Sequence, residues 1–487
     1  MLAKFTRYIA ICLVMFGTGG RANSQHLSSE IYATILGQIL SLHFESAESL
    51  INEYSAGPEM GPGIVYLRNY LEFLDVLIAG NMSGYEQYLS GAMARLDSIQ
   101  SKYGHLSDRL HLISAIYLQS SFLNAIHGDN FRAARNFYVA KRYHRQAESA
   151  RPGDPFNDKL EGLFNLFAGA APAEYHWLMR IFGIRGDMQL GLEQLTEYHE
   201  GTSGQDRLES CLILLYARQM TGLETGEKGD DCAEDTLTMH RYFHAYHALK
   251  SGHSREVIEL LNDWEQDPGE RALAYLDLLH GEALLNSTDK GAGDQLIRFL
   301  DRTRGDYFIK TAWHKLSWHH FLEGDSSAYH IARTNVIEKG NMMLDADIQA
   351  FREASEDVMP NAILLRSRLY FDGGFYLRAS ETLQEINPGD LANRKDSLEY
   401  TYRQARIADL LGGKDEAISK YHEVIEAGMG STWYFPSNAA LHLGMIYEEM
   451  GDTAQALDSY QTCLKMNRSA YKNSIGNKAK LGIRRLK

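Results

Sequence analysis

Short glycine-containing breaks interrupt an otherwise helical pattern along almost the whole chain. From Ser28 onward, apolar residues recur at three- and four-residue spacing, and no long segment alternates apolar and polar residues as a half-buried strand would. The breaks read HGDN, RPGDP, GIRGD, GTSGQD, SGHS, EGD, DGG, LGG and MGD. Most place a glycine before a polar or acidic residue that can cap the next helix. This alternation predicts an all-α, right-handed solenoid of antiparallel helix hairpins, roughly ten to twelve of them.

The segment LHLGMIYEEMGDTAQALDSYQTCLKMN (441–467) shows the repeat most clearly. Gly444 and Tyr447 fall on a first helix, Gly451 in the turn, and Ala456 and Tyr460 on a second helix. Gly444 and Ala456 are small, so the two helices can approach closely, while the tyrosines fill the space toward the next hairpin. Gly451 allows the tight reversal. The segment resembles the tetratricopeptide repeat (TPR), a helix–turn–helix unit.

Weaker copies of the repeat precede it. Corresponding positions carry Ala405, Gly412, Ala417 and Tyr421 in 402–428, Gly374 and Ala379 in 364–388, and Trp313, Ser317 and Gly324 in 313–332. Before about residue 270 the hairpins persist but the consensus fades. We therefore expect divergent hairpins over 28–270 and TPR-like repeats over 271–487. The basic end, YKNSIGNKAKLGIRRLK, is expected to form a capping helix over the last apolar face.

A second resemblance runs along most of residues 30–487. The segments GIRGDMQLGLEQL (183–195), KLSWHHFLEGD (315–325) and YKNSIGNKAKLGIRRL (471–486) look like exported TPR proteins of the Bacteroidetes type. More remotely they are similar to the eukaryotic TPR family that includes a mitochondrial outer-membrane protein involved in inclusion-body clearance. Neither resemblance implies catalytic residues or a cofactor.

The N-terminus predicts export. Lys4 and Arg7 precede an apolar run from Tyr8 to Phe16, and small residues including Ala22 follow. This pattern is typical of a cleaved signal peptide over 1–23, although an uncleaved anchor is the alternative. No later segment is apolar for long enough to span a bilayer. The expected location is therefore the periplasm, the cell envelope or the outside of the cell.

Three cysteines follow the signal-like segment: Cys211, Cys232 and Cys463. Cys211 and Cys232 could form a disulfide if adjacent helices bring them together. Alternatively, all three serve as small buried apolar residues.

The net charge of the 487-residue chain limits its partners. A formal charge of −14 argues against nucleic-acid binding and against docking on anionic lipid through overall charge. For a protein partner, it favours basic or neutral segments.

Histidine clusters are the strongest candidates for a chemical site. His240, His244 and His247 share one helical face and could hold zinc, but Arg241 stands where a zinc protease needs its glutamate. A packing face between hairpins is the simpler interpretation. The aromatic segment WHKLSWHH (313–320) likewise predicts filling between helices, or else a surface that stacks on sugars.

Recognisable catalytic signatures are missing. The sequence contains no nucleophile elbow, phosphate loop or dinucleotide fingerprint. We therefore expect a non-enzymatic protein-interaction scaffold of the cell envelope, with no cofactor, that binds a peptide or protein segment on the solenoid surface. The alternative is a glycan-binding or wall-associated helical protein.

Overall fold

The computed structural model describes residues 29–56, 61–103, 109–171, 175–221, 237–356, 358–391, 393–466 and 472–486. Within these residues the regular structure is helical. The first ten helices are α1 (Ser29–Leu40), α2 (Phe44–Ser55), α3 (Pro62–Ala79), α4 (Met82–Lys102), α5 (Arg109–Ile126), α6 (Asn130–Ala150), α7 (Pro155–Ala170), α8 (His176–Ile181), α9 (Met188–Glu200) and α10 (Gln205–Thr221).

The remaining helices continue the same plan. They are α11 (Thr238–Lys250), α12 (Ser254–Leu261), α13 (Tyr275–Asn286), α14 (Ala292–Arg302), α15 (Ile309–Leu322), α16 (Ser326–Glu338), α17 (Asp345–Ser355), α18 (Ala362–Asp372), α19 (Tyr376–Gln384), the 3₁₀ turn η4 (Pro388–Asp390), α20 (Arg394–Leu410), α21 (Lys414–Ala427), α22 (Phe435–Glu449), α23 (Thr453–Met466) and α24 (Lys472–Arg485). Among the described residues, no helix is both long and apolar enough to cross a membrane.

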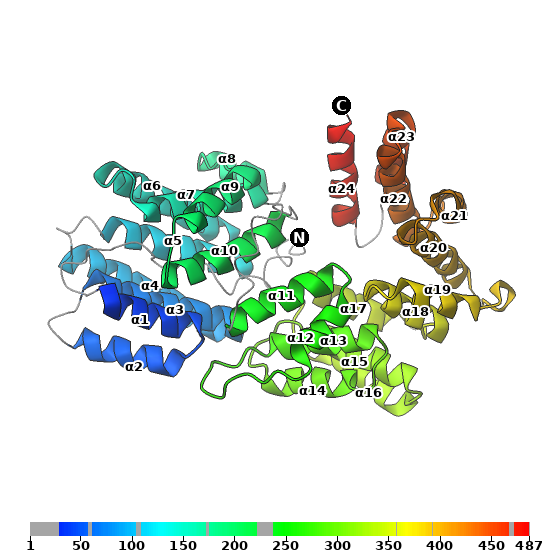
Figure 1. Cartoon of the computed structure of the whole chain (residues 1–487), viewed down its shortest axis with the longest axis horizontal. Coiled ribbons are helices and arrows are strands. Elements are labelled where there is room, and N and C mark those ends of the chain that lie inside the picture. The colour runs from blue at the N-terminus through cyan, green and yellow to red at the C-terminus, as the bar shows by residue number, and fades with distance from the viewer. Residues whose placement is uncertain are drawn as a thin grey trace.

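Most helices pack as sequential pairs. The pairs are α1/α2, α3/α4, α5/α6, α7/α9, α11/α12, α13/α14, α15/α16, α18/α19, α20/α21 and α22/α23. The short helix α8 interrupts the α7/α9 pair, and α17 packs on both α15 and α16. In Figure 1, α1–α10 gather in one group on the left, and the helices from α11 onward follow one another along an arc to α24 in red. The prediction of an all-α solenoid of paired hairpins is therefore confirmed.

The turns of the hairpins share one geometry. Each of the nine glycine breaks in the sequence contains one glycine with positive φ, from Gly128 (φ 82°) to Gly451 (φ 78°). In nine described hairpins, a residue with positive φ lies seven positions after one buried residue and five before another. These sets are Ile35/Leu42/Ala47, Phe73/Gly80/Tyr85, Ser121/Gly128/Ala133, Ala245/Gly252/Val257, Gly281/Thr288/Gly293, Ser317/Gly324/Tyr329, Ser367/Gly374/Ala379, Ala405/Gly412/Ala417 and Gly444/Gly451/Ala456.

This shared register extends the repeat into the N-terminal half. The Ser121 hydroxyl donates a hydrogen bond to the Ala133 carbonyl at 2.8 Å, and the Ser367 hydroxyl donates to the Ala379 carbonyl at 3.0 Å. The same contact thus ties α5 to α6 and α18 to α19. The hairpin geometry of the C-terminal half therefore also occurs before residue 270.

The first helices of the N-terminal hairpins form a closed group. Helices α1, α3, α5 and α7 pack one after another, and α10 contacts both α7 and α1. The next part of the chain packs against this group through hairpin turns: the Arg271 amide donates to the Leu42 carbonyl at 2.7 Å, and the Asp306 amide donates to the Gly80 carbonyl at 3.3 Å.

Buried apolar residues form several clusters rather than one core. The largest extends from Ile35 to Leu344, and a separate one extends from Leu398 to Ala479. Such separation is typical of a solenoid, in which each hairpin buries its apolar face mainly against its neighbours. The proposed division into 28–270 and 271–487 stays a prediction.

Candidate binding site

Among the predicted repeat-packing residues of 441–467, Gly444 packs against the ring of Tyr460. A Cβ atom added to Gly444 of α22 would lie 2.6 Å from Cε1 of this ring. One added to Gly482 of α24 would lie 2.4 Å from Cε2. Ala456 is fully buried on α23, and Tyr447 is buried on α22. The ring of Tyr460 therefore fits between two glycines of neighbouring helices.

The polar end of Tyr460 ties the same three helices together. Its hydroxyl donates a hydrogen bond to Glu448, and the Arg485 guanidinium donates to the two Glu448 oxygens at 2.8 and 2.9 Å. The hydrogen bond from Arg485 is the main reason that the pKa of Glu448 is lowered. In this way α24 is fastened onto α22 and α23, as a terminal capping helix requires.

The other predicted packing residues lie at matching positions. Ala405, Ala417 and Ala379 are fully buried, and Tyr421 is buried with its hydroxyl donating to Asp409 at 3.0 Å. Gly412 and Gly374 have positive φ at the hairpin turns. A Cβ atom on Gly374 would lie 1.9 Å from the Gly252 carbonyl oxygen, so two turns from distant hairpins touch there.

The three histidines of α11 differ in their surroundings. His240 is buried and interacts with the backbone of Leu208, His244 is half-buried, and His247 is exposed. Burial, assisted by His244, lowers the pKa of His240 to about 3. Within the described residues, no group of three potential ligands is placed to hold a metal ion. His240 thus packs α11 against α10.

Two further predictions concern residues outside the described part. The signal-like segment 1–23 lies there, and so does Cys232. Cys211 on α10 is disulfide-bonded, whereas Cys463 on α23 is a buried free thiol.

A groove crosses several hairpins of the C-terminal half. Its walls come from α15, α16, α17, α18 and α20, with residues 358–361 and 432–435 completing them. It encloses about 1230 Å³, part of which is open to solvent. Val358 and Met359 expose 59% and 50% of their surface, and Trp433 and Tyr434 are half-buried. Apolar side chains are therefore available to a partner along the groove.

Glu353 of α17 is the central charged group of this groove. Its carboxylate lies 3.5 Å from Arg368 and 3.7 Å from His314, and it accepts a hydrogen bond from Gln349 at 2.6 Å. Burial acts to raise the pKa of Glu353, but the charge of Arg368, the charge of His314 once it is protonated, and the Gln349 hydrogen bond lower it to about 2. Burial lowers the pKa of His314 to about 4. At neutral pH the groove thus holds an ionised carboxylate paired with Arg368, beside a neutral imidazole.

Other charges organise the rim. Arg333 of α16 donates from Nε to the Ala354 carbonyl at 2.8 Å and from its guanidinium to the Glu356 carbonyl, which satisfies the end of α17. Lys395 pairs with Glu356 at 2.6 Å. Four carboxylates line the groove against three cations: Glu353, Glu356, Asp396 and Glu399 against Arg333, Arg368 and Lys395. The groove is therefore close to neutral, unlike the whole chain.

The aromatic segment 313–320 packs within the protein. The Arg368 guanidinium lies 4.8 Å from the ring centre of Trp318, and the Lys315 ammonium lies 4.6 Å from it. The Lys339 ammonium lies 4.8 Å from the ring centre of Trp313. Both tryptophans thus have cations against their rings, which leaves less of the rings for stacking on a sugar.

Sequence reasoning found only part of the groove. Its lining includes His314, Ser317 and Trp318 of the aromatic segment 313–320, but the other lining residues were not found. Glu353, Arg368 and Met359 belong to no repeat consensus, and their proximity depends on how successive hairpins stack. The connection between α17 and α18 offered a further signal, because EDVMPN places two apolar residues before a proline in an otherwise polar turn.

Comparison with known proteins identifies the repeat. A family model for the tetratricopeptide repeat matches residues 438–467. No curated protein matches the sequence significantly. Two similar solved structures are the P58(IPK) TPR domain and the APC/C heterotetramer Cut9–Hcn1. The first is 13% identical, with 86% of this chain and 98% of that chain covered and a TM-score of 0.21. The second is 12% identical, with 95% and 97% covered and a TM-score of 0.24.

Residues 438–467 coincide with α22 and α23, the hairpin that the Tyr460 ring fastens to α24. The chain is therefore an all-α repeat protein that contains a tetratricopeptide repeat.

Proposed function

We propose that the protein is a non-enzymatic interaction scaffold that binds an extended peptide segment of a partner protein in the groove between α15 and α22. Tetratricopeptide repeats typically mediate protein–protein interactions, and their stacked hairpins offer continuous surfaces for a peptide. The observation that carries the proposal is the groove itself, which crosses successive hairpins and exposes Val358 and Met359.

The chemistry of the groove suits a segment of mixed character. Exposed apolar side chains beside half-buried Trp433 and Tyr434 provide contacts for apolar residues of a peptide. The Lys395–Glu356 pair at the rim can exchange its partners for charges of the peptide. Because the lining is nearly neutral, we expect apolar contacts rather than net charge to select the partner.

Peptide selection tests this proposal. Random peptides displayed on phage are selected for binding to the full-length chain, and the affinity of the selected peptides is measured by fluorescence polarisation. We expect Met359→Glu to weaken binding about tenfold or more, because it places a charge among apolar contacts. Leu377→Glu on α19 is the matched control, since Leu377 is 68% exposed and does not line the groove.

Equal effects of the two substitutions would count against the groove. Failure to select any peptide would also argue against it. If the chain binds soluble glycans and no peptide, the alternative function, a glycan-binding protein, would be supported. The cations against Trp313 and Trp318 make us favour the peptide.

We also propose that the scaffold is exported, on the strength of Lys4, Arg7 and the apolar run that follows them. N-terminal sequencing of the native protein tests this, with a start shortly after Ala22 expected. A start at Met1 in a cytosolic fraction would contradict it.

A further inference from the structure

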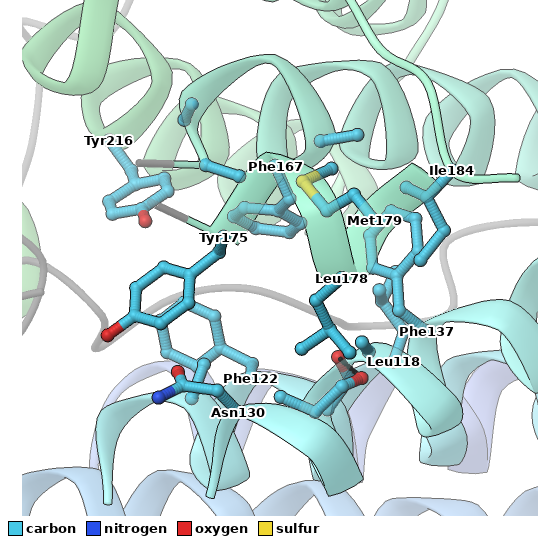
Figure 2. A pocket seen from close by; sticks show the side chains of 17 residues that line it. Leu118, Phe122, Asn130, Phe137, Phe167, Tyr175, Leu178, Met179, Ile184 and Tyr216 are labelled. Carbon is cyan, nitrogen blue, oxygen red and sulfur yellow. Dashed lines mark hydrogen bonds between the residues drawn. The ribbon is translucent and has the colours of Figure 1, made fainter. Parts of the chain in front are cut away.

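A second pocket lies in the N-terminal half, away from the groove. It is lined mainly by residues of α5, α6, α7 and α8, together with Tyr216 of α10, and spans about 760 Å³ including the part open to solvent. Figure 2 shows Leu178 of α8 within the ring of side chains, with Phe122 and Phe167 to one side and Phe137 to the other. Apart from a few polar atoms, the lining is made of rings, methyl groups and small alanines.

The small residues create the space. Ala125, Ala133, Ala134 and Ala168 contribute to the walls, and the hydroxyl of Ser121 is already bonded to the Ala133 carbonyl at 2.8 Å. An apolar pocket of this kind, open at the surface and walled by aromatic rings, suits one bulky apolar side chain of a partner.

The outer face of α6 carries an unusual charge. Phe131, Arg135, Tyr138, Arg142 and Arg145 follow one another at spacings of four and three, and all five are exposed. We call these five residues the α6 stripe. The helix has five basic residues and one acidic residue, in a chain whose formal net charge is −14. Within the described residues, the side chains of the three stripe arginines form no ion pair.

The stripe and the pocket adjoin along the same helix. Phe131, Arg135 and Tyr138 each directly follow a residue that lines the pocket, namely Asn130, Ala134 and Phe137. Neighbouring positions are about 100° apart around an α-helix, so the stripe runs beside the opening.

Aromatic contacts join the stripe to Phe182, the residue that follows α8. The Phe182 ring lies 5.8 Å from Phe131 and 6.0 Å from Tyr138. On α8, Trp177 and Ile181 are 56% and 66% exposed and lie one turn apart on the same face, while Leu178 and Met179 line the pocket. Exposed tryptophan, tyrosine and arginine beside a pocket are the composition typical of binding hot spots.

We propose that this pocket and the α6 stripe bind an acidic segment of a partner protein. A bulky apolar side chain of that segment enters the pocket, and its carboxylates pair with Arg135, Arg142 and Arg145. The local positive charge selects acidic partners, opposite to the preference expected from the charge of the whole chain. The site is separate from the groove between α15 and α22, so each can fail without the other.

Synthetic peptides test the proposal directly. The probe is a short, fluorescently labelled, glutamate-rich peptide with one central phenylalanine, measured by fluorescence polarisation with the full-length chain. We expect binding that weakens as salt is raised. Replacing the phenylalanine by alanine, or the glutamates by lysines, should each weaken binding about tenfold or more.

Variants of the protein locate the contact. Ala134→Trp, which fills the pocket from a half-buried position, and Arg135→Glu/Arg142→Glu, which reverses the stripe, should each weaken binding about tenfold. Lys290→Glu is the control, because its side chain is 86% exposed on another hairpin. Circular dichroism verifies that each variant is folded, and the peptide substitutions remain informative if one is not.

Several outcomes would overturn the proposal. One is that the acidic peptide does not bind at low salt. Another is that replacing its phenylalanine by alanine leaves the affinity unchanged. A third is that the stripe substitutions and the Lys290 substitution change the affinity equally. Vesicles of phosphatidylcholine and phosphatidylglycerol are tested in parallel. Stripe-dependent binding to these vesicles without binding to the peptide would assign the surface to a membrane instead.

Discussion

Lys159 of α7 and Glu209 of α10 form an ion pair, 3.1 Å long, in which neither side chain has any exposed surface. The Lys159 ammonium also lies 4.6 Å from the ring centre of Phe156. The pair joins two helices of the closed group formed by α1, α3, α5, α7 and α10. Removing one partner of such a pair leaves the other charge buried without compensation.

Lys159→Met should therefore lower the free energy of unfolding by about 3–5 kcal/mol. The double variant Lys159→Met/Glu209→Leu should recover most of this loss, because it buries no charge. Chemical denaturation of the wild type and both variants measures the effect. If Lys159→Met lowers the free energy of unfolding by less than about 1 kcal/mol, water reaches the ion pair and the account of a buried pair is wrong.

The fit of Tyr460 between Gly444 and Gly482 leads to a local prediction. Gly444→Ala places a methyl group 2.6 Å from the ring, and Ala456→Leu overpacks the same hairpin. Each substitution should lower the free energy of unfolding by about 1–3 kcal/mol. Because solenoid stability is roughly a sum of neighbour terms, hydrogen exchange should quicken in α22–α24 while α3–α7 keep their protection. Uniform loss of protection along the chain would contradict a solenoid, and no change would mean that the helices do not meet there.

The hairpin turns allow backbone strain to be measured without steric clash. Gly451 has φ 78° and no atom within 4 Å of an added Cβ. Gly451→Ala should therefore lower the free energy of unfolding by about 1–2 kcal/mol, because alanine is strained in the left-handed conformation even without a clash. Gly201→Ala is the control, since Gly201 has φ −84° and no contact closer than 3.6 Å. Equal changes in melting temperature for the two variants would contradict the turn geometry.

The buried imidazole of His240 predicts a pH dependence of stability. Burial lowers its pKa from 6.5 to about 3, so the folded protein keeps it neutral while the unfolded chain takes up a proton below pH 6.5. This contribution is present above pH 6.5 and is lost as the pH falls from 6.5 toward 3, by about 1.4 kcal/mol per pH unit. His240→Phe should reduce the loss of stability between pH 7 and pH 5, measured by denaturation at each pH. His247→Phe, at an exposed position, should not. A wild-type pH dependence retained in His240→Phe would contradict this assignment.

The sequence predicted the hairpins because their turns use glycine, whose positive φ carries little steric cost. It did not predict the same turn at Leu42 (φ 62°) and Thr288 (φ 56°), where the register holds without glycine. Tertiary contacts offset the backbone strain at both positions. Leu42 is fully buried, and the Thr288 hydroxyl forms a 2.8 Å hydrogen bond with the Tyr370 hydroxyl. Tertiary contacts of this kind do not appear in a local pattern, so these two turns could not be predicted from the sequence.

The candidate sites were less predictable than the fold for a related reason. The groove joins Glu353, Arg368 and Met359 through the stacking of hairpins, which no spacing in the sequence reveals. The α6 stripe was visible as Arg135, Arg142 and Arg145, but the net charge of −14 concealed it, because a sum over the chain ignores where charges lie. Gly482 likewise belonged to an expected capping helix, with no indication that it meets Tyr460.

Site-specific photo-crosslinking tests the peptide-binding groove most directly. A benzophenone amino acid replaces Met359 in one protein and Leu377 in another, and each is irradiated with the peptide selected on the wild type. We predict a crosslink at position 359, located by mass spectrometry and suppressed by excess unlabelled peptide, and none at position 377. Crosslinking at 377 but not at 359, or equally at both, would contradict binding in the groove.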